Sequence, residues 1–294
     1  MEKSTQVVIS ASRRTDIPAF YMDWFMEQIK QGYFESINPY NRNVTKVPAT
    51  PDYVHTIVFW SKNFDTFLEG DFGKKLSDKG FNLFFNFTVN SDCAVLEPRV
   101  PDLHERLVQI RNLCRQFGAQ SVNWRFDPIC FYTSAQNEIQ DNLHDFSRIA
   151  AEASQCGIRR CITSFMDDYP KIRKRAGAML GFSFVDPPLE QKKKILLLME
   201  KGLAEKSICL YACCEKQVLA SLPEESRIKS SSCIPNDFLV EIFGGHLSFN
   251  RDTGQRIKDG CGCRVSTDIG SYHLHPCYHN CLFCYANPSS QKPE

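Results

Sequence analysis

The sequence predicts an α/β fold: a TIM-like barrel, partial or closed, of about six βα units, with a cysteine-rich lobe at the C-terminus. Short β-branched and aromatic runs alternate with longer helix-like stretches through the first 212 residues, as expected for a parallel sheet. Each predicted strand also runs into polar residues, as in barrels whose chemistry lies at the carboxyl ends of the strands. A doubly wound open sheet would share this second feature, and we favour the barrel.

The six strands follow from the β-branched and aromatic runs, and the helices follow from the stretches between them. We expect strands at Val7–Ser10, Thr56–Trp60, Asn82–Val89, Ser121–Phe126, Arg159–Phe165 and Ser207–Ala212. We expect helices near Pro18–Gly32, Phe64–Lys79, Pro101–Phe117, Ala135–Cys156 and Pro188–Lys206. The first helix has Asp16 as its predicted cap and a proline just inside its start.

The composition of the chain changes after residue 215, which predicts two parts. Residues 1–215 form the barrel domain, and residues 216–294 form a lobe that packs on it and contains a short helix at Asp237–Phe243. With 294 residues, 43% of them hydrophobic, the chain can bury a large core.

The charge and hydropathy of the chain limit which partners and which cellular compartment we expect. The 35 basic and 34 acidic side chains nearly cancel, so a nucleic-acid partner is unsupported. No run reaches the roughly 18 apolar residues of a membrane span, and the N-terminus does not resemble a signal peptide. We therefore expect a cytoplasmic protein with no membrane partner, where clustered thiols more often hold metal than form disulfides.

The first chemistry-bearing motif is Cys277, Cys281 and Cys284, which we call the first set. Three thiolates at this spacing can bind a [4Fe-4S] cluster whose fourth iron stays free for a ligand. A closed zinc site completed by His275 or His279 is one alternative, and unligated core cysteines are another. A histidine such as His279 can tune a cluster or move protons, but more often it hydrogen-bonds a nearby carbonyl.

The other cysteines in the C-terminal part of the sequence predict another metal site. Nine of the fourteen cysteines fall from Cys209 onward. They include the second set: Cys213, Cys214, Cys233, Cys261 and Cys263. One of the adjacent pair plus the other three gives four thiolates, enough for an additional [4Fe-4S] cluster or a zinc ion, although a site without metal stays open.

The Cys-x3-Cys-x2-Cys spacing, with Phe283 before the last cysteine, resembles the signature of the radical S-adenosylmethionine (SAM) superfamily. The resemblance implies a [4Fe-4S] cluster, SAM bound at its open iron, and reductive cleavage of SAM to a 5′-deoxyadenosyl radical. It also implies a reductant such as flavodoxin or ferredoxin. The motif normally follows the first barrel strand, whereas here it follows the last, so we expect the tail to fold back across the barrel mouth.

Five segments are similar to those of one family, the uncharacterised bacterial and archaeal DUF1848 proteins, and the resemblance covers nearly the whole chain. The segments are Ser12–Pro18, Ile57–Asn63, Trp124–Pro128, Asp268–Gly270 and Cys284–Asn287. The family resemblance also favours Cys213 over Cys214 as a metal ligand. It implies no established substrate.

The polar strand ends supply the other candidate site residues. Arginine can bind a carboxylate through a bidentate fork and lysine as a point charge, whereas aspartate can act as an acid or a base. We expect catalytic roles for Arg13, Asp16, Arg125 and Asp127, and SAM binding by Arg14, Lys62 and Phe283. Ordinary salt bridges, Arg13–Asp16 or Arg125–Asp127, would explain the same residues.

The expected function is therefore a radical SAM enzyme acting on an unknown small molecule or nucleobase. One alternative is a zinc-stabilised binding protein without catalysis. Another is an iron-sulfur protein for electron transfer or redox sensing, which the lack of a Gly-Gly-Glu segment favours.

Overall fold

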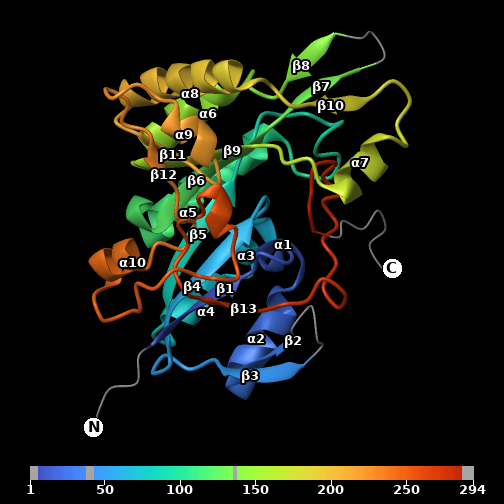
Figure 1. The fold of residues 1–294 in the computed structure, drawn as a ribbon. Coiled ribbons are helices and arrows are strands. Elements are labelled where there is room, and N and C mark those ends of the chain that lie inside the picture. Colours follow the sequence, from blue (N-terminus) through green and yellow to red (C-terminus); the bar gives the residue numbers. More distant parts are fainter. Residues whose placement is uncertain (1–5, 38–42, 135–137, 287–294) are drawn as a thin grey trace.

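The computed structural model describes residues 6–37, 43–134 and 138–286 and is built on an eight-stranded parallel sheet (Figure 1). The six predicted strands are confirmed, each overlapping its expected range. They are β1 (Val7–Ala11), β4 (Val54–Ser61), β5 (Asn82–Thr88), β6 (Val122–Ile129), β9 (Arg160–Phe165) and β11 (Cys209–Ala212). Two short strands, β12 (Lys229–Ser230) and β13 (Thr267–Asp268), complete the sheet at its edges.

The strand order is β12-β11-β9-β6-β5-β4-β1-β13. The six predicted strands thus lie side by side in chain order, without the reversal that defines a doubly wound sheet. In the described part of the chain β12 and β13 each pair on one side, with β11 and β1, so the sheet does not close into a complete barrel there. The α/β class is confirmed, with a large open parallel sheet.

Helices cover one face of this sheet. They include α2 (Met22–Gln31), α5 (Leu103–Phe117), α6 (Phe146–Gln155) and α8 (Leu189–Ala204), each of which lies within a predicted helix. Alternate strand residues point towards them because side chains alternate across a strand; Phe59, Phe85 and Trp124 are fully buried in this core. Burying a large aromatic side chain contributes roughly 1.5–3 kcal/mol.

Two predicted helices differ from the structure. The Phe64–Lys79 helix is split into α3 (Asp65–Glu69) and α4 (Phe72–Ser77), with Gly70 ending the first. The Ala135–Cys156 helix was predicted too long, because β8 (Ile139–Asp141) precedes α6; its residues 135–137 lie outside the described residues.

Several elements were not predicted. A hairpin joins β2 (Tyr33–Ile37) to β3 (Val44–Pro48), and a small sheet has the order β10-β7-β8. Its other strands are β10 (Ser183–Val185) and β7 (Phe131–Thr133). The unpredicted elements also include the short helices α7 (Pro170–Ala176) and α9 (Lys216–Ala220). The predicted Pro18–Gly32 helix is interrupted at Tyr21, and α1 (Ile17–Phe20) is its first part. Asp16 caps α1 as expected, since the Ala19 amide donates to its carboxylate at 3.0 Å.

Part of the C-terminal segment, residues 216–286, lies against the opposite face of the sheet, and the segment supplies both edge strands. Its helix α10 (Asn236–Phe243) matches the predicted Asp237–Phe243 helix, and Leu239 packs with Val8, Val58 and Phe84 from the strands. In Figure 1 the chain then continues through β13 and runs on as the red segment. The division at residue 215 stays a prediction, and residues 287–294 lie outside the described residues.

Within the described residues, the structure contains no helix of the length and apolarity needed to cross a bilayer.

Candidate functional site

The first set lies at the carboxyl ends of the strands, held by segments that follow three strands of the sheet. The Leu282 amide donates to the Leu96 carbonyl, in the loop after β5, at 2.8 Å. The Arg175 guanidinium, from α7 after β9, donates to the carbonyls of Leu282 and Cys284. Tyr285 donates to the Arg13 carbonyl, after β1, at 2.9 Å. The tail therefore folds back across the strand ends.

The three thiols of the first set lie near one another in a buried setting. Cys281 is 4% exposed, and electrostatic interaction with both Cys277 and Cys284 contributes to the raised pKa of its thiol. Burial, the largest cause, raises the pKa of all three thiols, that of Cys277 to about 12. Without a partner these groups would stay protonated, and a bound metal would have to displace their protons.

His279, which lies between Cys277 and Cys281, connects the first set to the strand ends by hydrogen bonds. Its Nε2 lies 2.9 Å from Asp16 Oδ2, and its Nδ1 lies 3.3 Å from the Arg99 carbonyl. Asp16 also accepts from the Ser61 hydroxyl at 2.7 Å and the Lys62 amide at 2.9 Å. The predicted catalytic Asp16 thus joins the end of β1, the end of β4 and the cysteine motif.

Lys62 is the cation that faces the first set. Its ammonium lies 2.5 Å from Glu97 and 5.1 Å from the centre of the Phe283 ring. Burial alone would lower the pKa of Lys62, but the charges of Glu97 and Cys281 raise it above its ordinary value. Apart from its ion pair with Glu97, the buried ammonium has no hydrogen-bond partner among the described residues, so an N–H donor remains for a further acceptor beside Cys281.

The second set forms a ring of five thiols on the face of the sheet that the C-terminal segment covers. Cys213 Sγ lies 3.8 Å from the Sγ atoms of both Cys214 and Cys233. Cys261 lies close enough to Cys214 and Cys263, and Cys263 close enough to Cys233, for each pair to shift the pKa of its thiols. The sequence left open whether Cys213 or Cys214 joins the set, and the structure brings both to it.

Gly262, which lies between Cys261 and Cys263 in the sequence, packs closely against the backbone of Ser231 and helps to hold the second set together. The Gly262 amide donates to the Ser231 carbonyl at 3.1 Å. A Cβ added to Gly262 would lie 2.6 Å from that carbonyl oxygen. Only glycine allows the loop of Cys261 and Cys263 to approach the end of β12 so closely.

Arg125 joins the second set to the polar residues of the sheet. From β6 its guanidinium donates to Cys233 Sγ at 2.7 Å and to the Asp127 carboxylate. Burial would raise the pKa of Asp127, but Arg125 and Ser164 hold it below its ordinary value. The Arg125–Asp127 salt bridge expected as the structural explanation is therefore present.

The remaining predicted site residues lie beside β13. Arg13 pairs with Asp268 at 3.0 Å and not with Asp16, and its buried Nη2 makes no hydrogen bond to the residues described. The charges of Asp268 and Cys263 outweigh burial and raise the pKa of Arg13. The Arg14 guanidinium donates to the Gly270 carbonyl at 2.9 Å. Arg13 thus faces the second set, and Arg14 holds the chain after β13.

A polar connection runs between the two cysteine sets. Asp127 bonds Arg125, and the Lys62 ammonium also helps to lower its pKa. Lys62 in turn lies beside Cys281, and Arg125 lies on Cys233. The structure therefore brings together most of the predicted site residues, in the order Cys281, Lys62, Asp127, Arg125 and Cys233.

Some residues at the site were not predicted. Glu97 lies in the loop after β5, and Arg175 lies in α7 after β9. Both are far from the first set in sequence, and the fold brings them next to it. Asp268 is the partner of Arg13 across 255 residues. The resemblance marked Asp268–Gly270 as a segment of interest, but no local pattern indicates any of these pairings.

The first set supplies three thiols, the ligand type of iron-sulfur clusters. In an iron-sulfur cubane each cysteine binds a different iron, so three thiols could hold three irons and leave the fourth open. The Lys62 ammonium beside Cys281 would stabilise the negative charge of such a centre. Among the residues described, no three His, Cys, Asp or Glu side chains are already arranged around one metal ion.

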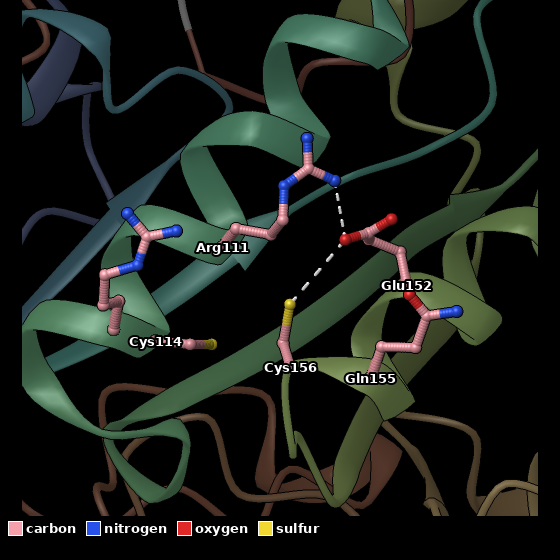
Figure 2. A pocket seen from close by; sticks show the side chains of 6 residues that line it. Arg111, Cys114, Glu152, Gln155 and Cys156 are labelled. Atoms are coloured by element: carbon pink, nitrogen blue, oxygen red, sulfur yellow. Dashed lines mark hydrogen bonds and ion pairs between the residues drawn. The ribbon is translucent and has the colours of Figure 1, made fainter.

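A cavity of about 300 Å³ lies elsewhere, between α5 and α6 (Figure 2). Arg111 crosses it to pair with Glu152 at 2.7 Å, and the Cys156 thiol donates to the same carboxylate at 3.9 Å. Cys114 and Cys156 both line it, and neither belongs to the two cysteine sets.

Comparison with known proteins identifies the chain by family. No curated protein matches it. The model of one family, described as a domain of unknown function, matches residues 8–286, which include both cysteine sets and all the predicted site residues. The chain belongs to the DUF1848 family.

Proposed function

We propose that this protein is a radical SAM-type iron-sulfur enzyme. The observation that carries the proposal is the position of the first set: Cys277, Cys281 and Cys284 lie together at the carboxyl ends of parallel strands. Active sites of parallel α/β proteins form at this edge. With strands in chain order, we also infer that the sheet works as a partial TIM-like barrel with the C-terminal segment across its mouth.

In this proposal the three thiolates hold a [4Fe-4S] cluster and leave one iron open to SAM. When reduced, such a cluster supplies the electron that splits SAM into methionine and a 5′-deoxyadenosyl radical. The residues of the chain bind the cluster and SAM, orient them and enclose them. His279 and Asp16 fix the loop that carries the thiols, and Arg175 caps its carbonyls.

Lys62 is the residue we assign to the SAM carboxylate or to the charge of the cluster. Its ammonium is buried beside Cys281 and Phe283 and has donors to spare. A buried cation stabilises a nearby anion strongly, because little water screens the interaction. Arg125 and Asp127 are already bonded to each other, so in this conformation they position neighbouring groups and are not free as acid and base.

The direct test is SAM cleavage by the anaerobically reconstituted, reduced protein, with 5′-deoxyadenosine as the product measured. The triple variant C277A/C281A/C284A should yield none while keeping its far-ultraviolet circular dichroism spectrum. The matched control is Cys209→Ala, since Cys209 at the start of β11 belongs to neither cysteine set. Cleavage that persists in the triple variant would refute the proposal.

Binding of SAM separates this function from its rivals. An electron-transfer or redox-sensing protein would contain iron but bind no SAM. A zinc-stabilised binding protein would contain stoichiometric zinc and no iron. Iron, sulfide and zinc analysis with equilibrium SAM binding therefore distinguishes all three.

A further inference from the structure

We propose that the second set binds a single zinc ion through Cys213, Cys233, Cys261 and Cys263, in a closed tetrahedral site that links the C-terminal segment to the sheet. The inference goes beyond the proposed SAM chemistry and does not depend on it. It also chooses between the two metals that the sequence left open for these cysteines.

The convergence of distant segments on one place is the first argument. The thiols of the second set come from the end of β11, the residues after β12 and the loop before β13. All five are free thiols, and they pack together as one cluster. Thiols bond each other only weakly, so the cluster adds little as a core. Four thiolates, however, close the coordination of a structural zinc ion and leave no open position.

The spacing of the sulfur atoms is the second argument, and it favours a single ion over an iron-sulfur cluster. Cys213 Sγ lies 3.8 Å from the Sγ atoms of both Cys214 and Cys233. Two thiolates on one zinc ion, with tetrahedral bonds of about 2.3 Å, lie about 3.8 Å apart. Ligands of a cubane lie much farther apart, because each binds a different iron. Cys213 and Cys233 thus have the separation of two ligands of one ion.

The backbone that carries the thiols is already held in place. The Cys213 amide donates to the Thr163 carbonyl of β9 at 2.8 Å. The Asn86 side-chain amide, from β5, donates to the Cys233 carbonyl at 2.9 Å. The close contact of Gly262 with Ser231 holds the loop of the other two ligands. Hydrogen bonds therefore position all three segments before a metal binds.

The positions of the thiols are those of a site without metal. In the described part of the chain, no three donor side chains already surround one point. Thiols that keep their protons pack side by side, and metal binding has to release these protons. Zinc would therefore draw the four sulfurs inwards as their protons leave.

The charged surroundings are the third argument. A zinc ion offsets only two of four thiolates, so the site would keep a net negative charge. The buried Arg125 donates to Cys233 Sγ at 2.7 Å, a length suited to a charge-assisted bond to a thiolate. The Arg13 guanidinium, nine-tenths buried, interacts electrostatically with Cys263. Arg125 and Arg13 therefore place positive charge on two sides of the site.

Burial selects the four ligands. Cys213, Cys233, Cys261 and Cys263 are 9%, 3%, 7% and 4% exposed, whereas Cys214 is only partly buried. Zinc takes four thiolates, so the fifth thiol is left over. Cys214 is therefore the spare thiol, and it provides a matched control.

The test uses the full chain with the first set removed, C277A/C281A/C284A, supplied with zinc and freed of unbound metal. We expect about one zinc per chain. Co²⁺ in its place should give the absorption bands of a tetrahedral thiolate site. Adding Cys233→Ser should abolish the bound zinc and these bands, whereas adding Cys214→Ser should preserve both.

Three results would overturn the zinc site: no zinc in the folded triple variant, full zinc retention with Cys233→Ser, or about four irons per chain in its place after reconstitution with iron and sulfide. Loss of zinc through Cys214→Ser alone would overturn the ligand set.

A second measurement covers a triple variant that fails to fold. Because metal binding contributes to folding, Cys233→Ser in the otherwise native chain should abolish the zinc and lower the urea midpoint of unfolding. Cys214→Ser should change neither. Zinc content unchanged by Cys233→Ser would overturn the inference. Absence of SAM cleavage in a chain that retains this zinc would contradict the proposed function and not the zinc site.

Discussion

His279 and Asp16, which are 263 residues apart, hydrogen-bond through Nε2 and Oδ2 at 2.9 Å. This contact fastens a cysteine motif at the end of the chain to the end of the first strand. A motif that follows the last strand in sequence therefore lies next to the first strand in space. The position along the chain is thus no obstacle to the proposed function.

His279→Phe should weaken iron binding at the first set, because it removes both hydrogen bonds and leaves Asp16 its donors from Ala19, Ser61 and Lys62. We expect the iron content to fall well below the roughly four irons per chain that one [4Fe-4S] cluster contains. The exposed His273 gives the control, and His273→Phe should change nothing. Full iron retention in His279→Phe would show that the contact does not position the motif.

The double variant K62M/E97Q should weaken SAM binding without loss of iron. Changing both residues avoids a buried unpaired carboxylate, which would destabilise the fold by itself. A charge-assisted hydrogen bond contributes about 1.5–3 kcal/mol, so SAM affinity should fall roughly tenfold or more. Equilibrium SAM binding under anaerobic conditions measures this, with E97Q alone as the control; equal affinity in the double variant and wild type would exclude Lys62 from the SAM site.

Asp127→Asn should destabilise the apo protein by roughly 3–5 kcal/mol near neutral pH, because it leaves Arg125 buried without its partner. The pKa of Asp127 is lower in the folded chain than in the unfolded chain. Its stabilisation is therefore present above pH about 4 and is lost as the pH falls through the folded value. The stability difference between wild type and variant should shrink over that acidic range.

Urea unfolding across that pH series measures the effect of Asp127→Asn. The control is Asp186→Asn, because Asp186 is 66% exposed in its ion pair with Lys192, and such a pair contributes at most about 1 kcal/mol. Equal effects of the two substitutions would show that the Arg125–Asp127 pair is not buried as described.

Gly262→Ala should destabilise the protein. The new Cβ would lie 2.6 Å from the Ser231 carbonyl oxygen, so the loop that carries Cys261 and Cys263 would have to move. Urea unfolding measures the loss of stability. The control is Gly202→Ala in α8, where a Cβ meets nothing within 4 Å and the helix should gain up to about 1 kcal/mol. Unchanged stability in Gly262→Ala would show that the loop does not approach Ser231 as described.

The sequence predicted the six main strands because each is a run of β-branched or aromatic residues that the core needs. It missed β12 and β13, since strands of two residues carry no pattern and exist only because the C-terminal segment reaches both edges of the sheet. The long Phe64–Lys79 helix is interrupted after Gly70, because the backbone of Asp71 adopts a left-handed conformation with φ 51°.

The candidate site also has a part that the sequence predicted and a part that it did not. The residue types were predictable, because thiols and strand-end arginines and aspartates are visible in the sequence. Their partners were not. A salt bridge between Arg13 and the nearby Asp16 was the structural alternative to catalytic roles, but Arg13 pairs with Asp268, and Asp16 bonds His279. Contacts across more than 250 residues depend on how the tail folds back, which no local pattern contains.

The measurement that tests the central claim most directly is electron paramagnetic resonance of the anaerobic, reduced protein with and without SAM. A cluster with an open iron predicts a signal whose shape changes when SAM is added to wild type, and no such change in C277A/C281A/C284A. Identical wild-type spectra with and without SAM would contradict the assignment of the first set as a SAM-binding cluster.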